Sequence, residues 1–141
     1  SPVENFLEGR FEPVLDDDRG IDRGAVKRVL LHAGKIHWDL RAELDKNPNP
    51  EIALVRVEQY YPAPIDELNT VLAQYPNAEL AWVQDEPENQ GAWPFIALEV
   101  ADQLGRPVRR ISRASAASTA TGSPKVHANE HAAIMSEALA R

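Results

Sequence analysis

Apolar and polar positions along the chain follow a repeating order of short β-type runs and longer helix-type segments. The β-type runs are nearly continuous stretches of aliphatic residues, as expected of parallel strands covered on both faces. These strands are predicted at residues 26–33, 52–57, 79–84 and 107–112. Between and after them, apolar residues recur every three or four positions. This spacing predicts helices over residues 36–46, 66–75, 93–104 and 125–140.

The alternation of strand and helix predicts an α/β fold in which helices cover both faces of a parallel sheet. Residues 12–15 add a candidate edge strand, because Pro13 is tolerated in a sheet only at its edge. Gly105 is expected to end the third helix in the left-handed conformation. Pro124 suits the first position of the last helix, where its missing N–H costs nothing.

The side chains expected to face the core follow the same periodicity. In the first helix they are Ile36, Leu40 and Leu44. In the third they are Phe95, Ile96, Leu98, Val100 and Leu104, and in the last Val126, Ala133, Ile134 and Leu139.

The chain divides at about residue 24. Residues 1–24 are interpreted as a lead-in segment, with the acidic run 16–20 as a surface loop or linker, and residues 25–141 as one α/β domain. The first residue is a serine and the sole methionine is Met135. We therefore expect this chain to be a piece of a longer polypeptide.

Composition narrows the class of protein. The chain has 141 residues, a net charge of −7 and no cysteine. The acidic balance argues against a general nucleic-acid binder. The lack of cysteine excludes disulfides, thiolate catalysis and cysteine-ligated metals. No apolar run approaches the roughly 20 residues that span a bilayer, and no secretory signature is present, so a cytoplasmic protein without membrane partners is expected.

The segment 82–94 carries the densest group of polar side chains. It leaves a predicted strand at its carboxyl end, which is where open α/β sheets usually place their functional residues. It is either a hydrogen-bonded turn or a binding and interface element, and we predict an interface role. The residues assigned to that interface loop are Gln84, Asp85, Glu86, Asn89, Gln90, Gly91 and Trp93.

Other candidate chemistry is sparse. His127 and His131 have the i, i+4 spacing of a helical metal-ligand pair, but Ala128 stands where the zincin pattern has glutamate, so no metal site is assigned. The sequence has no nucleophile elbow, phosphate-binding loop or serine triad spacing, and no catalytic residue is assigned. Arg56 lies within an apolar strand and needs a partner, for which Glu58 and Glu86 are the candidates.

Several motifs together resemble a known family. They are Leu-Leu-His-Ala-Gly-Lys at 30–35, Ile-Ala-Leu-Val-Arg-Val-Glu-Gln at 52–59 followed by Tyr-Tyr-Pro, and Gln-Asp-Glu-Pro-Glu-Asn-Gln-Gly-Ala-Trp at 84–93. Arg-Arg-Ile-Ser-Arg at 109–113 and Lys-Val-His at 125–127 complete the set. The chain resembles the C-terminal domain of the first, decarboxylating component of the 2-oxoglutarate dehydrogenase complex. Ser-Thr-Ala-Thr-Gly at 118–122 is similar to its actinobacterial branch.

The resemblance implies a transketolase-type C-terminal domain, a three-layer α/β/α sandwich with a five-stranded, mostly parallel sheet whose first strand is antiparallel. It implies that the full enzyme binds thiamine diphosphate and Mg²⁺ in preceding domains, outside this chain. It further implies a homodimer that passes a succinyl unit to a lipoyl-bearing acyltransferase. The fragment alone is then expected to be inactive, with a structural and regulatory role.

The resemblance also implies acetyl-CoA as an effector, for which Arg10, Lys35 and Arg56 are the candidate ligands. The turn at 65–67 includes Asp66 and Glu67, and such acids would repel phosphates. Two alternatives stay open at this point. One is the equivalent domain of a pyruvate dehydrogenase component or a transketolase, and the other is a free-standing α/β interaction module.

Overall fold

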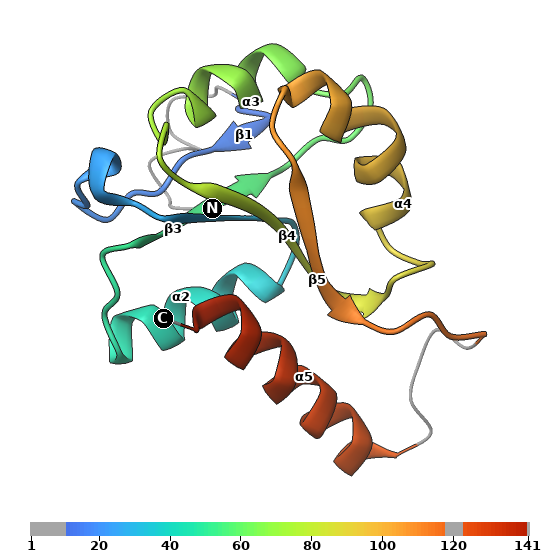
Figure 1. Ribbon diagram of the computed structural model, residues 1–141. Coiled ribbons are helices and arrows are strands. Elements are labelled where there is room, and N and C mark those ends of the chain that lie inside the picture. Colours follow the sequence, from blue (N-terminus) through green and yellow to red (C-terminus); the bar gives the residue numbers. More distant parts are fainter. Residues whose placement is uncertain (1–10, 118–122, 141) are drawn as a thin grey trace.

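The computed structural model describes residues 11–117 and 123–140. They build one five-stranded sheet in the order β1-β3-β2-β4-β5, with helices on both faces (Figure 1). The first strand pairs antiparallel with β3, while the pairs β2–β3, β2–β4 and β4–β5 are parallel. The predicted fold class, a mostly parallel sheet with an antiparallel edge strand, is confirmed.

The strands are β1 (Val14–Leu15), β2 (Arg28–His32), β3 (Ile52–Val57), β4 (Glu79–Pro87) and β5 (Val108–Arg113). The helical segments are η1 (Arg23–Ala25), α2 (Ile36–Lys46), α3 (Ile65–Leu72), α4 (Trp93–Phe95), η2 (Ile96–Val100), η3 (Ala101–Leu104) and α5 (Pro124–Leu139). The helix predicted over 93–104 is therefore a sequence of α, π and 3₁₀ turns. It ends at Gly105, whose φ of 65° is left-handed as predicted.

One strand is longer than predicted. β4 continues three residues beyond Gln84, since Pro87 still pairs with Arg113 of β5 after an irregularity in register that follows Val83. The first half of the polar segment is therefore sheet, and its side chains obey the alternation of a strand. Gln84 follows Trp82 on one face, while Asp85 follows Val83 on the other.

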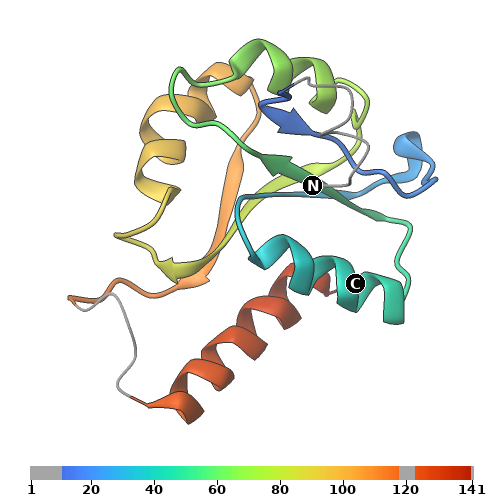
Figure 2. The same cartoon turned by 180° about the vertical axis from the view of Figure 1, so that it is seen from behind.

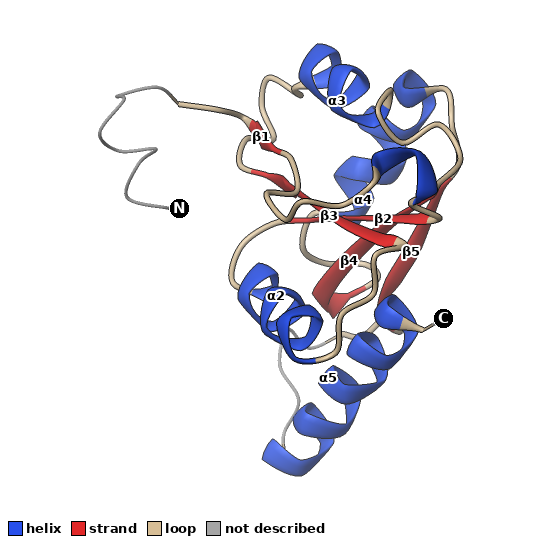
Figure 3. Cartoon of the chain, turned by 90° about the vertical axis from the view of Figure 1, so that its left-hand side faces the viewer, coloured by secondary structure: helices blue, strands red, loops and turns tan. Residues whose placement is uncertain are grey.

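The helices are divided between the two faces of the sheet. α3 and the α4–η2–η3 segment cover one face, and α2 and α5 cover the other (Figures 1 and 2). A view from the side shows α2 and α5 next to each other beneath the sheet (Figure 3). None of the helices in the part of the chain that the structure describes is long and apolar enough to cross a membrane.

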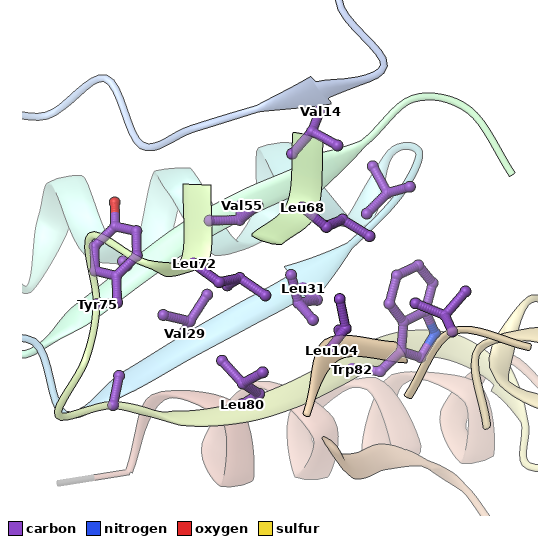
Figure 4. Packing of buried hydrophobic residues seen from close by; sticks show 14 of the residues in the cluster. Val14, Val29, Leu31, Val55, Leu68, Leu72, Tyr75, Leu80, Trp82 and Leu104 are labelled. Atoms are coloured by element: carbon purple, nitrogen blue, oxygen red, sulfur yellow. The ribbon is translucent and has the colours of Figure 1, made fainter. Parts of the chain in front are cut away.

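The core under α3 is built from alternate positions of the strands. Val29 and Leu31 of β2, Val55 of β3, and Leu80 and Trp82 of β4 meet the inner face of the helices (Figure 4). The helices contribute Leu68, Leu72, Ile96, Val100 and Leu104 to the same cluster. Leu98 was predicted to belong here, but it is 77% exposed. Its position midway between the buried Ile96 and Val100 turns it to the outer side of the helix.

The opposite face buries the intervening strand residues against α2 and α5. Ile36, Leu40 and Leu44 are buried on α2 as predicted. On α5 only Ile134 and Ala138 are buried, so the prediction holds for Ile134 but is wrong for Val126 and Ala133. The buried residues of α5 all lie in its C-terminal half, so much of its attachment must come from polar contacts.

The acidic run 16–20 forms a loop without helix or strand, as its composition predicts, but it is not wholly at the surface. Asp17 is 6% exposed, and its carboxylate accepts hydrogen bonds from the Leu54 amide at 2.8 Å and from the Arg19 side chain at 2.6 Å. Burial opposes ionisation of Asp17, but these hydrogen bonds outweigh it and hold its pKa below the usual value. Tyr75 donates its hydroxyl proton to Asp16 at 2.5 Å. Part of the predicted lead-in segment is therefore anchored to the domain.

Candidate functional site

Gln84 organises the polar segment from inside. Its Oε1 accepts hydrogen bonds from the Trp82 indole N–H at 2.9 Å and from the Trp93 backbone N–H at 2.8 Å. Its Nε2 donates to the carbonyls of Pro87 at 2.9 Å and Gln90 at 2.8 Å, with a longer contact to the Glu86 carbonyl at 3.3 Å. The amide is 4% exposed and uses both its donor and its acceptor capacity within the chain. Gln84 thus closes a loop from β4 to α4 with hydrogen bonds that all stay within the chain.

Gly91 allows the loop to turn inward on Gln84. Its φ is 64°, and a Cβ added there would lie 3.0 Å from the Glu86 Cβ and 3.2 Å from the Gln84 Oε1. Asn89 fixes the outer side of the loop. Its amide both donates to the Ala116 carbonyl at 2.9 Å and accepts from the Ala116 N–H at 3.0 Å. The loop is therefore held from both sides and presents a defined surface.

A hollow of about 320 Å³ opens beside this loop at the carboxyl ends of the strands. Tyr60 forms one wall, with its ring centroid 6.4 Å from that of Trp82 and 6.2 Å from that of Phe95. Burial, with the nearby carboxylates of Glu86 and Glu58, raises the pKa of the Tyr60 hydroxyl. We name this hollow the aromatic groove; its lining includes Ala33, Tyr60, Trp82, Gln84, Gly91 and Phe95.

The residues assigned to the interface loop do not share one environment. Gln84 is internal, Trp93 is half-buried at the start of α4, and Glu86, Asn89 and Gly91 are exposed. Asp85 lies on the other face of the sheet, where its Oδ1 is 2.8 Å from the Nδ1 of His131 on α5. Gln84 therefore supports the loop from inside, and Glu86, Asn89 and Gly91 form its outer surface. The interface role of these residues stays a prediction.

A second hollow, of about 280 Å³, lies on the α2 side near β1 and is named here the Arg56 cavity. Arg56 lines it with His37 and Arg41, and the acids of the 16–18 run form its rim. Arg56 is 8% exposed. Of its predicted partners it meets Glu58, whose Oε1 is 2.9 Å from Nε without the geometry of a hydrogen bond. Its guanidinium also lies 5.5 Å from the centre of the Trp38 ring. A buried Nε without a hydrogen-bond partner among the described residues is unusual.

Two histidines lie here: His37 lines the cavity, and the ring of His32 stacks on it at a centroid distance of 5.1 Å. His32 Nδ1 is 2.8 Å from the Leu30 carbonyl, which only accepts, so this nitrogen carries the proton. Its Nε2 then accepts from His37 Nδ1 at 2.8 Å. Burial, reinforced by the mutual effect of the two rings and by Arg56, lowers the pKa of His32 to about 3. Burial and the charges of Arg56 and Arg41 lower that of His37 to about 4. Both rings are therefore neutral near pH 7, and both ring nitrogens of His32 have a partner within the chain.

The structure does not bring the three predicted effector ligands together. Arg56 lines a cavity, whereas Lys35 is exposed at the N-cap of α2 and is not part of that lining. Arg10 lies outside the described residues. Three arginines of β5, Arg109, Arg110 and Arg113, are each paired with a carboxylate, Glu137, Glu88 and Glu130 respectively.

The structure does not bring His127 and His131 together with a common partner. His127 is exposed on α5, while His131 turns toward Asp85 of β4 and Asp39 of α2. Sequence reasoning missed Asp39, His37 and Tyr60. The alternation of β4 places Asp85 on the face opposite Gln84, and this was the available sign that it would meet a helix.

A family model described as 2-oxoglutarate dehydrogenase C-terminal matches residues 1–139. A multifunctional 2-oxoglutarate metabolism enzyme from Mycobacterium sp. (strain JLS) is 40% identical over 99% of this chain and 12% of its own length. The 2-oxoglutarate dehydrogenase E1/E2 component of Corynebacterium glutamicum is 39% identical over 99% of this chain and 12% of its own length.

A third relative shows the same relation in a different bacterium. The 2-oxoglutarate dehydrogenase E1 component of Staphylococcus saprophyticus is 49% identical over 67% of this chain and 10% of its own length. The chain therefore spans about a tenth of the length of the relatives it matches. What those names say about activity belongs to proteins that are far longer.

Proposed function

Because this chain belongs to the family of 2-oxoglutarate dehydrogenase C-terminal domains, we propose that it is the structural and regulatory C-terminal domain of a thiamine-diphosphate-dependent 2-oxoglutarate dehydrogenase. The observation that supports the structural role is the set of hydrogen bonds of Gln84, which all fix the loop between β4 and α4. The family match favours this reading over the equivalent domain of a pyruvate dehydrogenase component or a transketolase, and over a free-standing module.

The surface supported by that loop is suited to docking. Two exposed apolar residues lie close in sequence to residues that line the aromatic groove. Tyr61, next to Tyr60, is 89% exposed, and Leu98, three residues after Phe95, is 77% exposed. Aromatic side chains with defined positions are typical anchors of protein interfaces. We propose that the aromatic groove and Trp93 receive the preceding thiamine-binding domains of the same polypeptide or the second subunit of a homodimer.

The cofactors of the full enzyme are proposed to bind outside this chain. A Mg²⁺–diphosphate site needs oxygen ligands together with amide donors that remain free for phosphate. The Gln84 amide donates its hydrogen bonds to carbonyls of the loop, so it is not free for phosphate. The carboxylates Asp39 and Asp85 lie together with the imidazole of His131. These residues do not fit a thiamine diphosphate site, and we assign no catalytic step to them. Transfer of a succinyl unit to a lipoyl-bearing acyltransferase is likewise proposed for the full enzyme.

The experiment uses the full-length enzyme and this chain in parallel. The chain, purified free of full-length enzyme, should show no turnover of 2-oxoglutarate with thiamine diphosphate and Mg²⁺. In the full enzyme, Trp93→Ala should shift the subunit equilibrium toward monomer, measured by sedimentation, with activity falling in proportion to dimer. Val126→Ala, an exposed apolar residue of α5 on the other face, is the control. Native assembly combined with a lost chemical step in Trp93→Ala would mean that the loop is catalytic.

A second role, anion binding, is favoured by one specific observation. Arg56 is buried, lines a cavity and is ion-paired with Glu58, yet its Nε has no hydrogen-bond partner among the described residues. Charge-assisted hydrogen bonds to a phosphate would satisfy this Nε, and the acids Asp16, Asp17 and Asp18 that line the same cavity are already paired with arginines. We therefore propose that an acetyl-CoA effector of the full enzyme, if it uses this domain, contacts Arg56 first, with Lys35 and Arg10 as outer ligands.

Calorimetric titration of the full enzyme with acetyl-CoA tests this assignment. Arg56→Gln should weaken binding at least tenfold, as expected for the loss of one charge-assisted contact. Lys35→Gln should have a smaller effect, and Lys46→Gln, at the far end of α2, should have none. Equal affinity in the parent and in Arg56→Gln would refute the role of Arg56. No binding by the parent would refute the effector role of this domain, without affecting the structural proposal.

A further inference from the structure

We propose that Asp39 and His131 form a site for a divalent transition-metal ion, with Asp85 as the carboxylate that orients the histidine. The three side chains come from α2, β4 and α5, and their nearest ligand atoms all lie within 4.8 Å of one another. They are separated by 46 positions or more in the sequence, and only the packing of α5 beside α2 brings them together (Figure 3).

The hydrogen bond to Asp85 decides which ring nitrogen is available. His131 Nδ1 lies 2.8 Å from Asp85 Oδ1, a normal hydrogen-bond distance, so Nδ1 carries the proton. In the neutral ring the lone pair then resides on Nε2, which faces Asp39. A carboxylate that holds the far nitrogen of a metal-binding histidine is the usual outer partner of such ligands.

The distance on the other side of the ring suits a shared cation. His131 Nε2 and Asp39 Oδ2 are 3.5 Å apart, too far for a good hydrogen bond. With metal–ligand bonds of about 2.05–2.1 Å, this separation corresponds to an angle of about 115° at the metal, near the tetrahedral value. The exposed side of Asp39, at 52% side-chain accessibility, leaves room for water in the remaining positions.

The local charge also favours a cation. Within the described residues, neither Asp39 nor Asp85 has a lysine or arginine paired with its carboxylate. Arg113 donates to the Asp85 backbone carbonyl and pairs with Glu130, while Arg41 of α2 is held by Asp18 and Asp45. Two carboxylates thus flank one imidazole with no fixed positive charge between them.

The donor set selects the class of metal. One imidazole nitrogen and one carboxylate oxygen suit Zn²⁺ and its spectroscopic substitute Co²⁺ better than Mg²⁺ or Ca²⁺, which prefer oxygen alone. Such an ion would bridge α5 to α2, and α5 buries only Ile134 and Ala138. The bound metal would therefore raise the stability of the chain by linkage.

The test uses the tag-free chain, cleared of metal by chelation and dialysis, and titrated with Co²⁺ and then Zn²⁺. Visible absorption of Co²⁺ reports its coordination, and thermal unfolding reports the linkage. The parent should show a saturable Co²⁺ spectrum of tetrahedral type that Zn²⁺ abolishes, together with a rise in Tm. Asp39→Asn should weaken binding more than tenfold, and Asp85→Asn by about 10- to 100-fold, as for other outer partners of metal-binding histidines.

Two controls separate this site from the alternatives. His127→Ala should leave binding unchanged, since His127 is exposed and lies outside the cluster. Asp66→Asn, on an exposed acid of α3, should also bind as the parent does. Loss of binding in His127→Ala would move the site to the outer face of α5. Undiminished binding in Asp39→Asn, or no binding by the parent at about 1 mM metal, would overturn the proposal and leave His131 as a polar link between helices.

Discussion

Replacing Gln84 with alanine is the most direct perturbation of the surface that we propose for docking. The side chain is buried and forms five hydrogen bonds, three of them within β4 and two that reach Gln90 and Trp93 at the start of α4. Alanine removes all of them at once, yet it leaves the backbone of β4 intact. The Trp82 indole N–H, the Trp93 amide and the loop carbonyls then lose their common partner.

The magnitude follows from the geometry. Four of the five hydrogen bonds are 2.9 Å or shorter, and at about 1 kcal/mol each they total about 4 kcal/mol. The fifth, at 3.3 Å to the Glu86 carbonyl, adds little. Water entering through the aromatic groove would restore part of this, so we expect a loss of about 3 kcal/mol. That is a large share of the 5–15 kcal/mol typical of a domain.

Urea unfolding followed by tryptophan fluorescence measures the change, because Trp82 and Trp93 both report on the loop. Gln103→Ala is the matched control, since its amide is exposed and donates one hydrogen bond within the helical segment. It should cost less than about 0.5 kcal/mol. Gln84→Glu keeps the acceptor but turns a second oxygen toward the loop carbonyls, so it should be at least as destabilising as alanine at pH 7.

A loss below about 1 kcal/mol in Gln84→Ala, with an unchanged m-value, would show that the loop holds its shape without the amide. A mild effect of Gln84→Glu beside a large effect of alanine would show that only the acceptor half matters. The first result would remove the structural basis for treating residues 84–93 as a preformed docking surface, and the second would confine that basis to the hydrogen bonds that Trp82 and Trp93 donate.

Two further predictions concern stability. The pKa of His32 is lowered from 6.5 to about 3 by burial, so below pH 6.5 the unfolded chain takes up a proton that the folded chain does not. Stability should therefore fall by about 2 kcal/mol between pH 7 and pH 5 on this account, and His32→Asn should lack that component in urea unfolding; an identical pH dependence in the variant would contradict the assignment. Gly91→Ala should cost about 1–2 kcal/mol because its φ is 64° and its Cβ would crowd Glu86, whereas Gly20→Ala, with no atom within 4 Å of its added Cβ, should be nearly neutral in thermal unfolding; equal costs would show that the loop at residue 91 adjusts freely.

Local sequence patterns were sufficient to predict most of the strands and helices. The continuous aliphatic run of β3 and the four-residue spacing of Ile36, Leu40 and Leu44 predict their elements with the observed bounds. Gly105 ends its helix for a reason that is local to one residue. These features depend on backbone preference and on the burial of one face, both of which are encoded within a few positions.

The same patterns failed where a helix meets the sheet over part of its length. Periodicity treats every apolar position on a face as equal, so it placed Val126 in the core with Ile134. In the structure only the second half of α5 buries its apolar residues, and this depends on how the helix packs against the sheet. Burial of such residues is a property of the assembled layers.

The site depended on tertiary structure most of all. The sequence was sufficient to place the polar segment at the end of β4 and to indicate the family of the chain. It assigned one common role, however, to Gln84, Asp85 and Trp93. Alternation along β4, which extends to Pro87, divides them: Gln84 joins the aromatic groove, and Asp85 crosses to His131 and Asp39. Hydrogen-bond partners at a separation of 46 residues are set by strand order and register, and no local pattern carries that information, because the contacts exist only after the layers have packed.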